Sequence, residues 1–325
     1  MKRNIAFVFF SFLISCEQKE LVKTTRLKGF VFGTTYNITY VSKQNKTHQK
    51  SIDSLFQLVN ASLSTYIPTS IISRINQGET DIVVNELFKE VYQKSKRIFK
   101  ETDGYFDPTV GNLVNAWGFG PKKSKKEMDT LEVRKMIQFV GLDKVQLIEG
   151  KIVKKYAEIF IDFNSIAKGF GVDVVGRFLE NKNVKNYLVE IGGEIRVRGK
   201  NDNGNYWKVA IEKPNTDGSQ SFQTTILLEN ASMATSGNYR KFRVTDTGKK
   251  YVHTVNPKTG FAKESNLLSV SVIAPLDCAD VDAYATAFMA MGFEKTNEFL
   301  KSHPKLKAIL IYLNPQGELV EYTSK

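Results

Sequence analysis

The chain has 325 residues, a length that allows one large or two modest domains, and a formal net charge of +12. Because 42% of its residues are hydrophobic, an intrinsically disordered chain is excluded. Its two cysteines cannot build a disulfide framework or a four-cysteine zinc site. The basic excess favours an anionic partner, and composition leaves nucleic acid, a membrane surface and a phosphorylated small molecule open.

The N-terminus has the pattern of an export signal. Lys2 and Arg3 precede an apolar run over residues 5–14, which is too short to span a bilayer but suits a signal-peptide core. The run ends in Leu13-Ile14-Ser15-Cys16, which resembles a bacterial lipobox, with cleavage before Cys16 and a lipid on this residue. The alternative is an ordinary cleaved signal peptide.

These features predict a signal peptide over residues 1–15, a lipidated tether over 16–26 and a folded domain over 27–325. The domain would be lipid-anchored to a membrane of the bacterial cell envelope, on the periplasmic side. Cys278 would then be the only free thiol, and we expect a small buried residue there rather than a nucleophile.

The first half of the chain mixes strands, helices and loops. The β-rich run over residues 29–41 predicts a strand pair or a kinked strand around Gly33, and apolar residues at helical spacing predict helices around residues 52–59 and 87–99. A loop with a short helix, a solvated helix and a β-hairpin turning at Glu149-Gly150 are expected over residues 104–121, 122–136 and 145–161.

Strands and helices alternate more clearly in the second half. Helices are predicted over Ser165–Leu179 and Asp280–Met291, followed by a helix and a strand that ends near Tyr312. Strands are expected at residues 187–191, 195–198, 207–212, 224–228, 239–244 and 268–272. Because no regular βαβ repeat is present, the order favours an α+β or mixed α/β fold.

One segment, residues 160–173, suits an anionic ligand. A strand runs into Asp162, and a polar turn then opens a helix that carries Lys168, Gly169 and Gly171. The first turn of a helix has free backbone N–H groups, Lys168 adds positive charge, and the glycines permit close approach. The alternative is a capped helix with an exposed lysine.

Two glycine-rich segments are weaker candidates. Glu190-Ile191-Gly192-Gly193-Glu194 follows a predicted strand, but paired glycines also mark a bulge or a tight turn. Asp107, near Trp117-Gly118-Phe119-Gly120, places a carboxylate beside aromatic loop surface that suits a flat heterocycle such as adenine or flavin. Core packing of Trp117 and Phe119 is the alternative.

His253 lies at a predicted strand end before the turn Pro257-Lys258-Thr259-Gly260. This placement is typical of a general base or a phosphate contact, and a structural histidine is the alternative. His48 and His303 lie in polar segments that we expect to be exposed.

Asp282 and Thr286 are separated by one helical turn near the start of a predicted helix, so their oxygens share a face. Oxygen ligands of this kind suit Mg²⁺, which usually keeps waters or phosphate oxygens as its other ligands. The alternative is stabilisation of the helix dipole by acidic residues in the first turn.

Together these segments resemble the ApbE family, the FAD:protein FMN transferases, over nearly the whole mature chain and in the family's order. The matching stretches are Gly33–Tyr36, Ser64–Tyr66, Ser73–Asn76, Phe106–Gly111, Trp117–Gly120, Asp162–Asp173, Glu190–Gly193, Ala234–Tyr239, His253–Gly260 and Asp282–Thr286. Two positions depart from the family pattern: Phe32 replaces the usual Met, and Asn164 replaces a more usual Gly or Ser.

The resemblance implies an α+β fold with a mixed sheet, related to the T-fold, and helices packed on the sheets. It implies Mg²⁺-dependent transfer of the FMN moiety of FAD, through a phosphoester bond, to a Thr or Ser hydroxyl of a target protein, with release of AMP. The implied acceptors are subunits of membrane respiratory complexes of the Nqr or Rnf type.

Site residues are carried over by position. The resemblance places Mg²⁺ on the carbonyl of Ala167 and the side chains of Asp282 and Thr286, with His253 and Asp282 as catalytic residues. The implied FAD-binding residues are Phe32, Tyr66, Asp107, Lys168, Asp173, Gly193 and His253.

Two other functions stay open. Water in place of the protein hydroxyl would make the chain an FAD pyrophosphatase that yields FMN and AMP. A lipoprotein that binds FAD without chemistry is the second alternative. The predicted export and the lack of a dedicated motif disfavour nucleic acid as a partner.

Overall fold

The computed structural model describes residues 22–43, 47–121, 128–212, 222–238, 242–244, 250–262 and 266–324. The predicted signal peptide, Cys16, residues 122–127 of the predicted solvated helix and residues 239–241 lie outside these ranges. No helix in the described part of the chain is long and apolar enough to cross a membrane.

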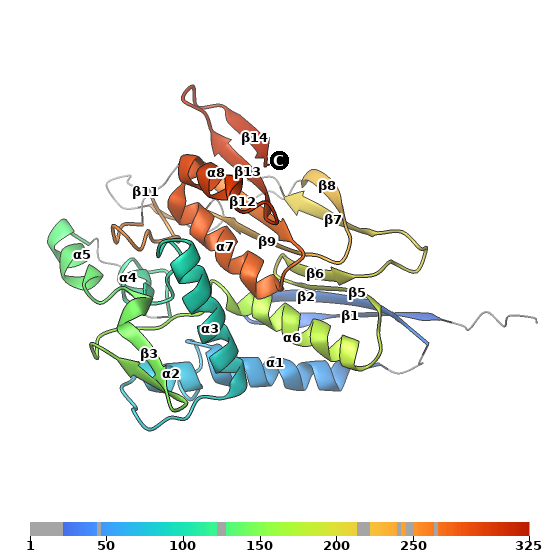
Figure 1. Ribbon diagram of the computed structural model, residues 1–325, viewed down its shortest axis with the longest axis horizontal. Helices are drawn as coiled ribbons and strands as arrows, with labels where there is room; N and C mark the ends of the chain where they lie inside the picture. Colours follow the sequence, from blue (N-terminus) through green and yellow to red (C-terminus); the bar gives the residue numbers. More distant parts are fainter. Residues whose placement is uncertain are drawn as a thin grey trace, which may run out of the picture.

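An eight-stranded sheet forms the centre of the molecule (Figure 1), in the order β1-β2-β5-β6-β9-β12-β13-β14. Its strands are β1 Lys23–Val31, β2 Thr34–Ser42, β5 Asn186–Ile191, β6 Glu194–Arg198, β9 Ser232–Gly237, β12 Leu267–Ala274, β13 Lys307–Leu313 and β14 Leu319–Thr323. Every neighbouring pair is antiparallel. The α+β prediction is confirmed, and the main sheet proves antiparallel rather than mixed, because short turns join β1 to β2, β5 to β6 and β13 to β14.

The helices pack against one face of this sheet. Helices α6 (Ala167–Asn181) and α7 (Cys278–Met291) lie side by side across it (Figure 1), with α6 on β5 and β6 and α7 on β9 and β12. Outside them lie α1 (Gln49–Leu63), α3 (Glu86–Glu101) and α8 (Phe293–Lys301). Because α7 is covered by these elements, its residues are apolar on nearly every side, which is the pattern of a buried helix.

The opposite face is covered by a small sheet of β7 (Trp207–Glu212) and β8 (Phe222–Leu228). Successive strand residues point to opposite faces, so Val272 of β12 joins the main core while Ile273 packs on the second core beneath β7 and β8. This arrangement leaves the start of α6 and the whole of α7 on the side of the sheet away from β7 and β8.

The remaining elements are short. The helices are α2 Ile71–Asn76, α4 Gly111–Ala116, α5 Thr130–Ile137 and a 3₁₀ turn at Leu142–Lys144, and the hairpins are β3 Val145–Ile148 with β4 Lys151–Lys154 and β10 Phe242–Val244 with β11 Lys250–Val252. Most predicted elements are confirmed, whereas α2, β9 and β14 had no clear pattern in the sequence.

Three expectations need correction. Strand β1 begins at Lys23, so residues 23–26, assigned above to the tether, belong to the sheet. His48 is buried rather than exposed, because its ring packs between Tyr40 and Phe178. The buried position expected for Cys278 is confirmed.

Candidate active site

The site is built where the first turns of α6 and α7 meet. The amide of Gly169 in α6 donates a hydrogen bond of 3.0 Å to Oδ2 of Asp282 in α7. A Cβ atom on Gly169 would lie 2.4 Å from the carbonyl oxygen of Cys278, so only glycine allows the two helices to approach this closely. The Asp162–Asp173 and Asp282–Thr286 segments are therefore adjacent in space.

Two carboxylates and one ammonium share this junction. Lys168 Nζ lies 2.5 Å from Oε2 of Glu194, whose side chain is 1% exposed. Burial raises the pKa of Asp282 to about 8, the charge of Glu194 adds to this rise, and the charge of Lys168 opposes it. Burial also raises the pKa of Glu194, against the effect of Lys168. With both carboxylates ionised, the three groups carry one negative charge in excess, which favours a bound cation.

The oxygen atoms near Asp282 are suitable ligands for a hard divalent cation. Thr286 lies one turn further along α7, with its Oγ1 3.4 Å from Oγ of Ser236 on β9, and Ala167 is the first residue of α6. A carboxylate, a hydroxyl and a backbone carbonyl are oxygen ligands of the kind that Mg²⁺ prefers. Among the described residues, no group of three His, Cys, Asp or Glu side chains is arranged to hold a metal ion.

Two turns at the ends of strands flank the start of α6. Phe32, in the turn between β1 and β2, packs its ring so close to Gly171 that a Cβ there would lie 2.4 Å from the ring. The turn between β5 and β6 is held by Glu190, which accepts bonds from the amide of Gly193 (2.8 Å) and from Nδ2 of Asn37 (2.7 Å). The predicted residues Phe32, Lys168 and Gly193 thus come together around α6.

Tyr66, Asp107 and Asp162 form a second group, just before α6. The amide of Asp162 donates to the carbonyl of Pro108 (2.7 Å), which joins the strand end to the Asp107 loop. Asn76 exchanges two bonds with the backbone of Ile161, at 2.7 and 2.8 Å. Tyr66 is 60% exposed, and partial burial and the charge of Asp162 raise the pKa of its hydroxyl.

Burial raises the pKa values of Asp107 and Asp162 to about 6. Asp107 Oδ1 accepts from the amide and the hydroxyl of Thr109, whereas Asp162 accepts from the amide and Nδ2 of Asn164. Both carboxylates are desolvated, and hydrogen bonds from residues within their own turns fix their orientation.

His253 directly follows β11, at the strand end that the sequence predicted, and is half-buried. Its loop is tied to the rest of the site by neighbouring residues. Thr254 donates to Asn238 (2.8 Å), next to β9, and Asn256 donates to the carbonyl of Ala290 (3.1 Å), one turn beyond Thr286 on α7. The loop therefore lies at the far end of α7 from Asp282.

Two sequence-based interpretations change. Trp117 is a core residue, buried against Phe261 with its indole N–H bonded to the carbonyl of Gly260, so the core alternative is confirmed. Asp173, expected among the FAD contacts, is fully buried, and its carboxylate binds Arg196 and two backbone amides of α7. Because both oxygens are engaged within the protein, we reassign Asp173 from ligand binding to positioning.

The structure adds residues that the sequence analysis did not single out. Glu194 and Glu190 bracket the paired glycines, and Ser236 lies beside Thr286. Acidic residues on both sides of Gly192-Gly193 were a visible signal, but only the fold shows that Glu194 is buried against Lys168. Asp162 was likewise visible in the sequence as an acidic residue at the end of a predicted strand.

The sequence model of the ApbE family matches residues 32–310. The chain is 38% identical over 326 residues to an FAD:protein FMN transferase of Haemophilus influenzae, with 96% of this chain and 92% of that protein covered. It is 38% identical over 292 residues to the Vibrio cholerae protein of the same name, with 87% and 85% covered.

Solved structures give the same result. The flavin transferase ApbE from Vibrio cholerae superposes with a TM-score of 0.83 at 34% identity, covering 94% of this chain and 98% of that one. The apo flavinyl transferase ApbE of Pseudomonas stutzeri also reaches 0.83, at 28% identity, covering 94% and 95%. With sequence and fold in agreement over nearly the full described length, the chain belongs to the ApbE family.

Proposed function

We propose that this chain transfers the FMN moiety of FAD to a Thr or Ser hydroxyl of another protein and releases AMP. The observation that carries the proposal is the buried Asp282, paired with Gly169 and close to the charges of Glu194 and Lys168, in a chain whose relatives are named FAD:protein FMN transferase. A buried, charge-rich junction of this kind suits the positioning of a pyrophosphate.

The reaction exchanges the phosphoanhydride bond of the pyrophosphate for a phosphoester bond to the acceptor. The acceptor hydroxyl oxygen bonds to the FMN-side phosphorus, the bond between that phosphorus and the bridging oxygen breaks, the hydroxyl gives up its proton, and AMP leaves with the bridging oxygen. Phosphoryl transfer of this type depends mainly on positioning and charge neutralisation. Mg²⁺ held by Asp282, Thr286 and the carbonyl of Ala167 would neutralise charge on the pyrophosphate.

The remaining roles fall to side chains around that junction. Lys168 would place its ammonium near the phosphates and exchange part of its contact with Glu194 for them. His253 is proposed at the phosphate end, either taking the hydroxyl proton or contacting a phosphate oxygen. Phe32, Tyr66, Asp107 and Gly193 would line the FAD site, with Asp107 as hydrogen-bond acceptor for the nucleotide ring or ribose.

The expected result of a direct assay is a covalent flavin on the acceptor. Incubation of the chain with FAD, Mg²⁺ and membranes of its own organism should give a fluorescent protein band after denaturing electrophoresis, and mass spectrometry should find FMN on a Thr or Ser. His253→Ala should lose labelling while still binding FAD. An absence of labelled product from wild type contradicts the transferase proposal.

The same assay separates the two alternatives. Release of AMP and free FMN in equal amounts, without an acceptor, identifies hydrolysis by water at the same site. FAD binding without any AMP release on addition of Mg²⁺ identifies a binding lipoprotein. Acceptors from membrane respiratory complexes of the Nqr or Rnf type would appear as labelled membrane subunits.

We also propose that Cys16 carries the lipid that holds the chain to the periplasmic side of a membrane. The support is the Leu13-Ile14-Ser15-Cys16 pattern after an apolar run. Cys16→Ala should move the protein from the membrane fraction to the soluble periplasmic fraction or leave it with its signal uncleaved. Unchanged membrane retention with a cleaved signal contradicts the lipid anchor.

A further inference from the structure

Helices α6 and α7 cap each other rather than themselves. Within the described chain, neither Ile166 before α6 nor Asp277 before α7 makes a side-chain cap to its own helix, whereas Asn85 caps α3 and Asp129 caps α5. The first amides of a helix have no partner within it and need acceptors from elsewhere. In this pair the acceptor for each helix comes from its neighbour.

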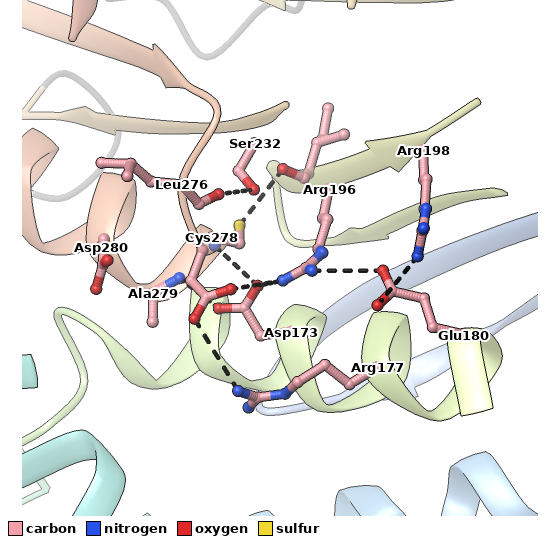
Figure 2. A network of polar contacts seen from close by, with 12 residues as sticks. Asp173, Arg177, Glu180, Arg196, Arg198, Ser232, Leu276, Cys278, Ala279 and Asp280 are labelled. Carbon is pink, nitrogen blue, oxygen red and sulfur yellow. Dashed lines mark hydrogen bonds and ion pairs between the residues drawn. The ribbon is translucent and has the colours of Figure 1, made fainter. Parts of the chain in front are cut away.

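Asp173 of α6 supplies the cap for α7 (Figure 2). Its Oδ1 accepts from the amide of Cys278, and its Oδ2 accepts from the amide of Ala279, both at 2.8 Å. In the other direction, Asp282 of α7 accepts from the amide of Gly169 in the first turn of α6. The two helices are therefore joined by carboxylate–amide bonds that run both ways.

Arg196 keeps this arrangement in place from the sheet. Its Nη1 lies 2.7 Å from Oδ1 of Asp173 (Figure 2). The same atom lies 2.7 Å from Oδ1 of Asp277, so one guanidinium joins the cap to the residue that precedes α7. Lys94 of α3 binds the other oxygen of Asp277 at 2.8 Å. These two pairs explain why Asp277 is turned away from its own helix.

Asp173 and Gly169, whose amide contacts the candidate metal carboxylate Asp282, lie on one face of α6. Gly169 and Asp173 are separated by one helical turn, so both face α7. Asp173 fixes the first turn of α7, and Asp282 follows in the next turn. A shift or rotation of that first turn would carry Asp282 away from Gly169, Lys168 and Glu194.

We propose that Asp173 is a positioning residue, which holds Asp282 in place against α6 by capping α7 from α6. The expected effect of Asp173 on cation binding rests on the function proposed above. Its expected effect on the hydrogen bond between Gly169 and Asp282 does not. Groups that orient metal ligands typically change metal affinity by about 10- to 100-fold when they are replaced.

Asp173→Asn tests this role because asparagine keeps the volume but offers an oxygen to only one of the two amides. Glu180→Gln is the matched control, since Glu180 lies on the same helix and binds Arg196 and Tyr187 without touching α7. Hydrogen exchange of the amides of Gly169, Cys278 and Ala279 is measured by NMR without metal. Binding of Mn²⁺, as a probe for Mg²⁺, is measured by electron paramagnetic resonance on the same full-length samples.

We expect Asp173→Asn to speed exchange at Gly169 and at the α7 amide that loses its acceptor, and to weaken Mn²⁺ binding, each by about tenfold, and Glu180→Gln to do neither. Wild-type exchange at Gly169 in Asp173→Asn overturns the proposal, as does an equal effect of Glu180→Gln. If Asp173→Asn does not fold, Arg196→Lys removes the guanidinium contact that keeps Asp173 in its capping position, so Gly169 exchange should also quicken, and unchanged exchange there overturns the proposal.

Failure of the proposed function has a different signature. If wild type binds no Mn²⁺, or if Asp282→Ala binds it equally well, the cation assignment fails. The exchange rate of the Gly169 amide still decides whether Asp173 positions Asp282.

Discussion

Replacing Asp282 by asparagine is expected to lower the rate of FMN transfer about a thousandfold while leaving the fold intact. Asparagine can still accept the bond from the Gly169 amide, but it loses the charge that a cation on the pyrophosphate needs. A metal contribution of several kcal/mol corresponds to this loss, because each 1.36 kcal/mol is about a tenfold change in rate. Transfer is measured by flavin fluorescence of the labelled acceptor.

The same variant should change how the stability of the metal-free protein depends on pH. The folded-state pKa of Asp282, about 8, lies above its ordinary value of 3.8, so the folded protein holds a proton that the unfolded chain releases. Asp282 therefore makes the fold lose stability as the pH rises from 4 to 8, by up to about 1.4 kcal/mol per pH unit. The asparagine variant lacks this contribution.

Unfolding by urea at pH 6, 7 and 8, in the presence of a chelator, gives the comparison. Burial raises the pKa values of Asp107, Asp162 and Asp173 only to about 6, so the pH dependence above that value reflects mainly Asp282. Asp81→Asn is the control, because its side chain is 94% exposed. Wild-type transfer by Asp282→Asn contradicts the ligand role, and parallel pH curves contradict the raised pKa.

Gly169→Ala is expected to lower the free energy of unfolding by about 2–3 kcal/mol and to reduce transfer about a hundredfold. The added Cβ would lie 2.4 Å from the carbonyl oxygen of Cys278 and 2.8 Å from the amide nitrogen of Ala279. These are backbone atoms, which cannot turn away as a side-chain end can, so α6 and α7 must separate. The separation stretches the bond between Gly169 and Asp282.

Gly176→Ala is the matched control on the same helix. Its Cβ would meet flexible side-chain atoms of Arg196 at 3.1 Å, and alanine favours a helix over glycine by about 1 kcal/mol, so the two effects offset each other. Urea unfolding and the transfer assay are measured for both variants. Equal losses in the two variants contradict a specific role for the close approach at Gly169.

Most of the local structure was predictable because it depends on neighbours in the sequence. Apolar residues at helical spacing mark α1 and α3, and the β-rich run around Gly33 marks the β1–β2 hairpin. Strand β9 was missed because its residues acquire strand partners only from β12 and β6, far along the chain, whereas β14 pairs with the neighbouring β13 across a short turn. Their short sequences carry too little alternation to predict a strand.

The sequence predicted many residues of the candidate site, but not which of them contact one another. The sequence marked Lys168, Gly193 and Asp282 as chemically interesting, and the fold brings their segments together at one junction. Asp173 belongs to the same motif as Lys168, yet its carboxylate faces backbone amides. Whether a carboxylate binds a ligand or positions the backbone depends on its burial, and burial depends on which elements pack against it.

The sequence by itself determined the family and most of the order of the elements, because motifs and short-range periodicity are written along the chain. Only the tertiary structure determined which carboxylates contact which backbone amides and charged side chains. Gly169 and Asp282 are 113 residues apart, and Asp173 and Cys278 are 105 apart, so only the packing of α6 on α7 brings them into contact. The net charge of +12 suggested an anionic partner, and the fold reveals a local excess of buried carboxylates that favours a cation beside it.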